Sequence, residues 1–131
     1  MRRLPIALLA AFSVLLLAAP AEAASVKGRW KGTVHIVKGG TGSFPVKMRI
    51  TRTRVGARAG TLSNPGTPCH GTLRVSSRRN GGYSLRYKEL SSSSRCTGDD
   101  RIFIKRSGAR LAWRATSPDG GQVGRTLLRR A

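Results

Sequence analysis

The sequence predicts an all-β fold, a small antiparallel up-and-down barrel of about eight strands. Apolar and polar residues alternate with period two along most of the chain after residue 23, and no stretch there has the 3.6-residue period of a helix. Clusters of Gly, Asn, Asp and Pro separate the alternating stretches at intervals of about a dozen residues. Closing eight short strands into a barrel removes open sheet edges, which favours a barrel over the alternative, a β-sandwich.

The first 23 residues are typical of a secretory signal peptide. Arg2 and Arg3 form a positive start, an apolar run follows over residues 4–19, and Ala21-Glu22-Ala23 fits the small-residue cleavage pattern. The apolar run is shorter than the ~20 residues that a spanning helix needs. We therefore expect cleavage after Ala23, no transmembrane segment after cleavage, and a single secreted barrel domain over residues 24–131.

Each strand is expected to turn one face to the core and the other to water. The clearest strand covers residues 44–51, and its predicted inward side chains are Phe44, Val46, Met48 and Ile50. The first strand is expected to bury Trp30, Gly32, Val34 and Ile36, and a later one Cys69, Gly71, Leu73 and Val75. Further strands are predicted at 55–62, 83–89, 101–106, 109–115 and 122–129. The connectors contain turn residues, among them Asn80-Gly81 and Asp119-Gly120, so neighbouring strands should be antiparallel.

Cys69 and Cys96 are the two cysteines of the chain. In an exported protein, one disulfide between them is the simplest interpretation, and closing that loop stabilises a fold by about 3–4 kcal/mol on the chain-entropy model. The alternative is a metal site built from Cys69, His70, Cys96 and His35. The spacings C-x-x-C and H-x-x-x-H are absent, so we expect a disulfide and no metal.

Several short motifs follow one another along the chain. Trp30-x-Gly32 opens the first strand, Cys69-x-Gly71-x-Leu73 follows a Pro-containing loop, Glu89 lies just before Cys96, and a Leu-x-Arg closes the chain. In these motifs the chain resembles a family of small secreted actinobacterial β domains, also found as the extracellular ends of some membrane-anchored serine/threonine kinases. It departs from that family at Asn64-Pro65-Gly66, where Tyr-Pro-Ser is more usual. The resemblance implies a lipocalin-like or avidin-like barrel, but it supplies no catalytic residue and no ligand.

Charge is the strongest functional signal. The chain has 25 Lys and Arg against 5 Asp and Glu, a net charge of +20; removing two arginines and one glutamate with the leader leaves +19. A barrel of this charge attracts extracellular polyanions, and the planar guanidinium matches phosphate and carboxylate. The predicted contacts are outward side chains of the strands, namely Lys47, Arg49, Arg74, Arg86, Lys88, Arg101, Lys105 and Arg114.

Specific nucleic-acid recognition is not expected. The chain has two Trp, two Tyr and three Phe, and Phe103 is the one aromatic residue of the predicted strands that should face outward. A platform that stacks bases needs several exposed rings. We expect the protein to contact polyanions through its charge without recognising a specific nucleic-acid sequence. We also expect it to be a monomer.

The barrel interior is a second place for a site. Glu89 and Arg125 are both expected to point inward near a barrel mouth, where they could form an ion pair or bind a ligand; alternatively, both side chains bend out to water.

Catalysis is not predicted. The carboxylates after residue 23 are Glu89, Asp99, Asp100 and Asp119, and the one acidic pair, Asp99-Asp100, lies in a predicted turn. No nucleophile elbow, Gly-rich phosphate loop or zinc motif occurs, so no catalytic residue or cofactor is expected.

Three functional hypotheses follow from the sequence. The first is a secreted, non-catalytic binding or sensor module for polyanions or a small ligand. The second is a structural role at the cell wall, in which the charge serves only solubility and retention. The third is an enzyme or inhibitor whose site has no recognisable motif.

Overall fold

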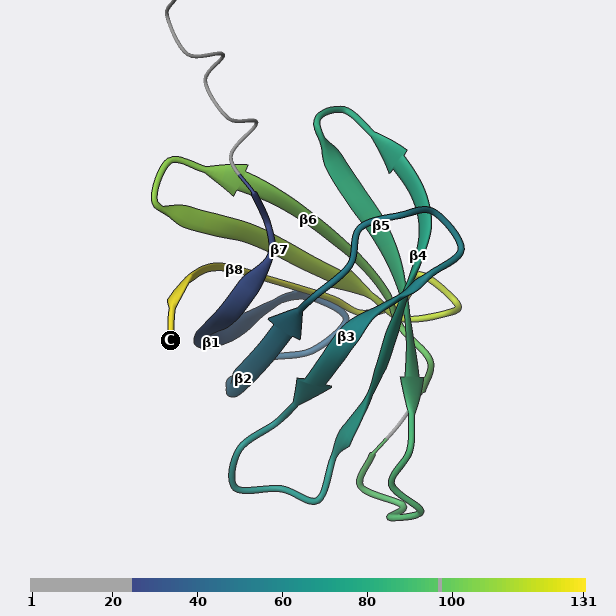
Figure 1. Ribbon diagram of the computed structural model, residues 1–131. Helices are drawn as coiled ribbons and strands as arrows, with labels where there is room; N and C mark the ends of the chain where they lie inside the picture. Colours follow the sequence, from purple (N-terminus) through teal and green to yellow (C-terminus); the bar gives the residue numbers. More distant parts are fainter. Residues whose placement is uncertain (1–24, 97) are drawn as a thin grey trace, which may run out of the picture.

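The protein forms a closed antiparallel barrel in the computed structural model, which describes residues 25–96 and 98–131 (Figure 1). The strands are β1 (Gly28–Lys38), β2 (Ser43–Ile50), β3 (Arg58–Ser63), β4 (His70–Arg79), β5 (Gly82–Glu89), β6 (Arg101–Ser107), β7 (Arg110–Thr116) and β8 (Val123–Arg130). Each strand pairs with the next in the chain, and β8 pairs with β1. The predicted eight-stranded up-and-down barrel is confirmed, and the sandwich alternative is wrong.

Four predicted strands begin one to three residues later than expected, at Arg58, His70, Arg110 and Val123, and the first two show the reason. The third was expected from Val55, but residues 51–57 form a turn in which Gly56 has a φ of 86° and donates its N–H to the Val75 carbonyl at 2.8 Å. Pairing in β3 therefore starts at Arg58. Cys69, which was expected inside a strand, lies just before β4. In both places, residues that the alternation assigned to a strand lie in the connection that precedes it.

The β4–β5 hairpin has the turn that its residues predict. Asn80 and Gly81 both have positive φ, 53° and 73°, as a two-residue type I′ turn requires. The twist of this turn matches the twist of the strands it joins.

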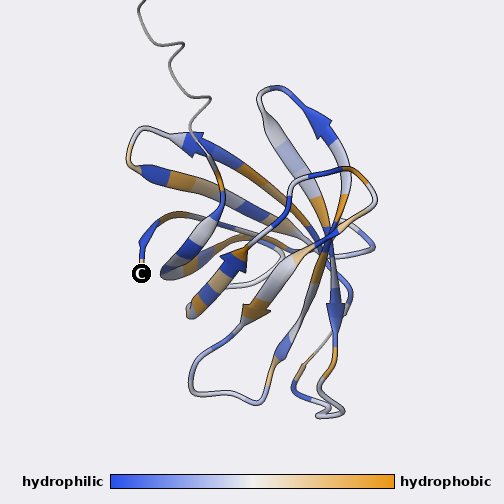
Figure 2. Cartoon of the chain, viewed as in Figure 1, coloured by the Kyte–Doolittle hydropathy of each residue, from blue (hydrophilic) through white to orange (hydrophobic). Residues whose placement is uncertain are grey.

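The core fills the barrel with side chains from every strand. Hydrophobic and hydrophilic residues alternate along the strands (Figure 2). The predicted inward residues Val46, Met48 and Ile50 of β2 are buried, and Phe44 is partly buried against the same core. Trp30 and Trp113 are both buried. The interior is therefore packed with apolar side chains.

The two ends of the barrel are closed differently. At one end, the predicted disulfide between Cys69 and Cys96 joins the β3–β4 and β5–β6 loops, which project together in Figure 1. At the other end, Val26 is buried and its carbonyl accepts a hydrogen bond from Trp30 Nε1 at 2.8 Å. The guanidinium carbons of Arg106 and Arg130 lie 5.3 and 4.0 Å from the centre of the Trp30 ring.

The predicted signal peptide, residues 1–23, lies outside the described residues. Within the described residues, no helix has the length and apolar character needed to cross a membrane.

Candidate anion-binding surface

The outer face of the barrel is basic on every side. All eight predicted contacts, Lys47, Arg49, Arg74, Arg86, Lys88, Arg101, Lys105 and Arg114, are exposed. Glu89 is the one acidic residue within the eight strands, and it lies at the end of β5. Outward strand positions therefore present positive charge with almost no acidic residue between them.

Four arginines lie side by side across β3, β4, β5 and β6. Arg58 is opposite Arg74, Arg74 is opposite Arg86, and Arg86 is opposite Arg101. Neighbouring strands are about 4.8 Å apart, so this row, which we call the arginine ladder, extends about 14 Å around the barrel. Sequence reasoning selected three of its members and missed Arg58, because a register shift between Arg58 and Gly60 sets its pairing.

The ladder concentrates charge at an energetic cost. Like charges directly opposite each other on paired strands repel and destabilise the pairing. The Arg74 guanidinium donates to the Gly56 carbonyl at 2.6 Å, which relieves part of its need for acceptors but does not neutralise it. An anion lying along the ladder would supply acceptors and charge together, because each guanidinium can donate two parallel hydrogen bonds to a phosphate or carboxylate.

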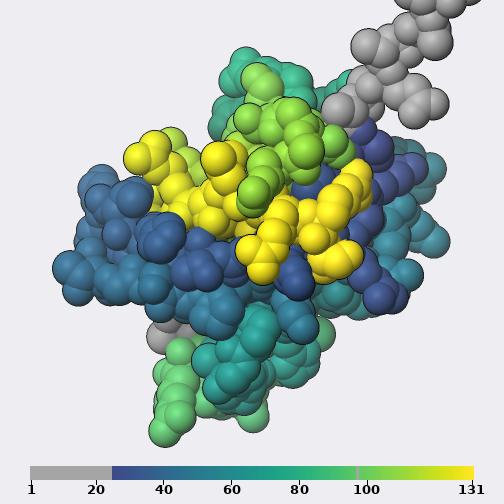
Figure 3. All heavy atoms as spheres, turned by 90° about the vertical axis from the view of Figure 1, so that its left-hand side faces the viewer, coloured from purple at the N-terminus to yellow at the C-terminus, as the bar shows by residue number. Residues whose placement is uncertain are grey.

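Arg125 does not point inward, and the predicted interior pair with Glu89 is wrong. Arg125 is exposed and lies opposite Arg114 and His35 on the outer face. The inward positions of β8 are Gly124 and Leu128, because a side chain at Gly124 would meet Val34 and because Leu128 is buried. Figure 3 shows β8, in yellow, on the molecular surface between β1 in blue and the β6–β7 hairpin in green. Packing of β8 on the core therefore fixes Arg125 toward water.

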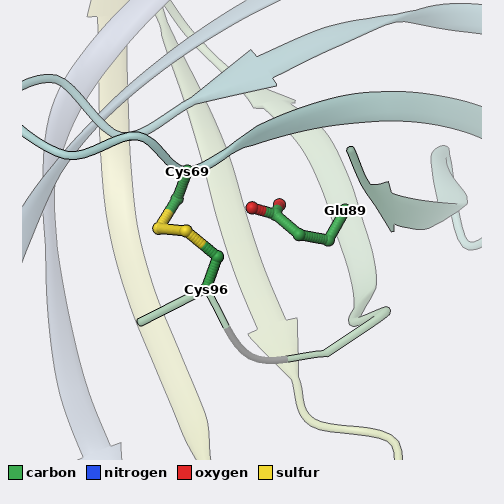
Figure 4. Close-up of side chains that lie close together, drawn as sticks. All are labelled: Cys69, Glu89 and Cys96. Atoms are coloured by element: carbon green, nitrogen blue, oxygen red, sulfur yellow. A yellow bond between two sulfur atoms is a disulfide. The ribbon is translucent and has the colours of Figure 1, made fainter. Parts of the chain in front are cut away.

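Glu89 lies at the disulfide end of the barrel. Its Oε2 accepts a hydrogen bond from the Tyr87 hydroxyl, and its Oε1 is buried with no hydrogen-bond partner among the described residues. In Figure 4 the carboxylate points toward the disulfide. Burial, followed by the hydrogen bond to Glu89, raises the pKa of the Tyr87 hydroxyl far above its ordinary value, so this phenol stays protonated.

Further carboxylates gather at the same end. Asp99 Oδ1 accepts the backbone N–H of Glu89 at 3.0 Å, and the Asp100 carbonyl accepts that of Tyr87 at 2.9 Å. Burial, the Asp99 charge and the Glu89 charge together raise the pKa of the Asp100 carboxyl to about 6. The fourth acid, Asp119, is in the β7–β8 loop at this end, where hydrogen bonds from the Ser117 hydroxyl and the Gly121 N–H lower its pKa.

The alternative metal site is not assembled. The sulfur atoms of Cys69 and Cys96 are bonded to each other, so they are not thiolate ligands. His70 Nδ1 lies 3.0 Å from the Pro68 carbonyl, and His35 is on β1 between Ser43 and Arg125. In the part of the chain that the structure describes, neither histidine is hydrogen-bonded to Asp99 or Asp100, the arrangement that would have favoured an acid–base site.

Neither a model of a known protein family, nor a curated protein, nor a solved structure matches this chain. The resemblance to secreted actinobacterial β domains therefore stays a prediction.

Proposed function

We propose that the protein is a secreted, non-catalytic module that binds extracellular polyanions, and that the arginine ladder is its main contact. The observation that carries this proposal is the cross-strand alignment of Arg58, Arg74, Arg86 and Arg101. Guanidinium groups on adjacent strands offer a linear anion a row of bidentate donors on a rigid sheet.

The placement of these charges favours binding over a role in solubility alone. Solubility needs net charge, which is best spread out, whereas arginines aligned across four strands repel one another. The one acid in the four ladder strands is Glu89, at the disulfide end of β5, and no strand pairing places a carboxylate opposite a ladder arginine. An uneven surface of this kind also orients the molecule toward a polyanion during approach.

The packed interior favours the outer face over the barrel lumen as the binding site. Leu73, Leu85, Ile104, Leu111 and Leu128 are all almost completely buried in the middle of the barrel. A small ligand inside would have to displace such side chains. Of the two ligand classes in the first hypothesis, polyanions and a small ligand, we therefore propose polyanions.

The test compares retention of the mature, oxidised protein on immobilised polygalacturonate, polyphosphate and duplex DNA between about 50 and 300 mM NaCl, a range in which purely counterion-driven binding weakens steeply. The ladder variant is Arg58→Gln/Arg86→Gln. The matched control, Arg110→Gln/Arg129→Gln, removes the same charge from exposed positions on β7 and β8.

We expect the ladder variant to elute at lower salt than the control, with a slope of log affinity against log salt reduced by about two, one for each lost contact. Equal losses in the two variants would mean that net charge alone retains the protein. That result would contradict a role for the ladder and favour the solubility-driven alternative.

A further inference from the structure

A hollow lies on the outer face of β4–β7, where the arginine ladder ends. Its volume is about 370 Å³, within the range of small-ligand sites. Arg101, the last member of the ladder, forms part of its wall, and Arg79 and Arg114 line it as well. A polymer bound along the ladder would therefore reach this hollow without leaving the sheet.

The hollow contains the outward-facing aromatic ring of the described strands. Phe103 lies on β6 opposite Ser84 and Arg114, both of which are on the outer face. The tip of its ring lies over Gly82, because a Cβ at that glycine would be 2.7 Å from Phe103 Cζ. A glycine at this position thus leaves room for the ring to lie down on β5 instead of standing out into water. The remaining aromatic side chains of the described residues are packed in or against the core.

Hydroxyl groups surround the ring. Ser76 and Ser84 line the hollow, and the Ser76 hydroxyl donates to the Ser84 carbonyl at 3.0 Å. The Ser76 oxygen keeps its acceptor capacity, and the Ser84 hydroxyl can both donate and accept. The hollow thus combines one apolar ring, neutral hydroxyls and three guanidinium groups.

We propose that this hollow binds a sugar ring, so that the polyanion bound by the ladder is an acidic polysaccharide; the inference rests on the proposed function above. A pyranose has an apolar C–H face that can cover Phe103, hydroxyls that match Ser76 and Ser84, and, in a uronic acid, a carboxylate that matches a guanidinium. A polyphosphate chain has no ring to place there. A single half-buried ring stacks one base at most, whereas binders of single-stranded nucleic acid use successive rings.

The test uses Phe103→Leu, which keeps an apolar side chain of similar size but removes the flat ring. The control is Leu127→Ala, a change at an exposed apolar position on β8. The wild type and these two variants are compared at about 50 and 300 mM NaCl. The affinities measured are those for polygalacturonate, polyphosphate and single-stranded DNA. A second variant, Phe103→Tyr, keeps the ring, and far-ultraviolet circular dichroism verifies that each variant is folded.

We expect Phe103→Leu to weaken polygalacturonate binding about fivefold at the higher salt, as loss of an aromatic contact implies, while polyphosphate binding is unchanged and Phe103→Tyr behaves as the wild type. An unchanged polygalacturonate affinity, or an equal loss on polyphosphate, would overturn the inference. A loss confined to DNA would indicate a nucleobase in the hollow and overturn it as well. Failure of the proposed polyanion function gives a different result. In that case the ladder variant and its charge-matched control would lose equal affinity for every polymer, whatever Phe103→Leu does.

Discussion

Asp100 illustrates how a single carboxyl group is tuned by its place at the disulfide end. Burial raises its pKa first, and the charges of Asp99 and Glu89 raise it further, to about 6 from an ordinary value of 3.8. The folded protein therefore binds this proton more tightly than the unfolded chain does. The ionised carboxylate costs stability above pH 6, and that cost disappears as the pH falls from about 6 to about 4.

We predict that the free energy of unfolding rises as the pH is lowered from 7 to about 5, and that Asp100→Asn removes this part of the pH dependence. The variant should be more stable than the wild type at pH 7 by about 1 kcal/mol, less than the pKa shift alone implies, because the carboxyl is partly exposed and its charge is screened. Urea denaturation at pH 5, 6 and 7 measures both quantities.

Asp119→Asn is the control for this experiment. Hydrogen bonds lower the pKa of Asp119, so ionisation of this carboxyl favours the fold and its removal should not stabilise the protein at pH 7. Identical pH profiles for the wild type and Asp100→Asn would contradict the prediction.

Among the structural elements, the β3–β4 and β5–β6 loops depend on each other through the disulfide. The Cys69–Cys96 bond spans 27 residues and ties the second loop, which carries Asp99 and Asp100, to the end of the barrel. The backbone contacts of Tyr87 with Asp100 and of Glu89 with Asp99 lie in the same region. The disulfide therefore supports both the fold and the environment that raises the Asp100 pKa.

We predict that Cys69→Ala/Cys96→Ala lowers the free energy of unfolding by about 3 kcal/mol, as loss of a loop of this length implies. The same variant should lose the stabilisation between pH 7 and 5, because a looser loop returns Asp100 to water and its pKa toward the ordinary value. Denaturation of the double variant, with the chemically reduced wild type as a second sample, tests both effects. A retained pH effect would show that the loop is held without the disulfide.

Alternation along the chain predicted the strands and most inward side chains, because each strand has one dry face, and the turn residues predicted antiparallel neighbours. It could not predict the arginine ladder, since the pairing of Arg58 with Arg74 and of Arg74 with Arg86 depends on register shifts within β3 and β4. It failed at Arg125 for a related reason. Leu127 and Leu128 are adjacent, so the sequence does not say which one is buried, and the answer reverses the direction of Arg125.

At the scale of the whole molecule, charge is separated between the two parts of the surface. The acids at 89, 99, 100 and 119 lie at the disulfide end, while the strands carry lysine and arginine. Repulsion among so many like charges destabilises the compact state, and the ladder adds three pairs of arginines that are directly opposite each other. The same arrangement that would attract a polyanion therefore weakens the unliganded barrel.

This trade-off predicts that raising NaCl from about 20 to 300 mM increases the free energy of unfolding of the wild type, because screening weakens the repulsion. Arg58→Gln/Arg86→Gln should be more stable than the wild type at 20 mM NaCl, by about 0.5 to 1 kcal/mol, and should gain less from added salt. Arg110→Gln/Arg129→Gln, with the same net charge, should fall between the two. Guanidinium is itself a salt, so the measurement is urea denaturation at each NaCl concentration. If the ladder variant were less stable than the charge-matched control at low salt, the ladder arginines would be contributing to folding, which would contradict the proposal that they are kept for an external anion.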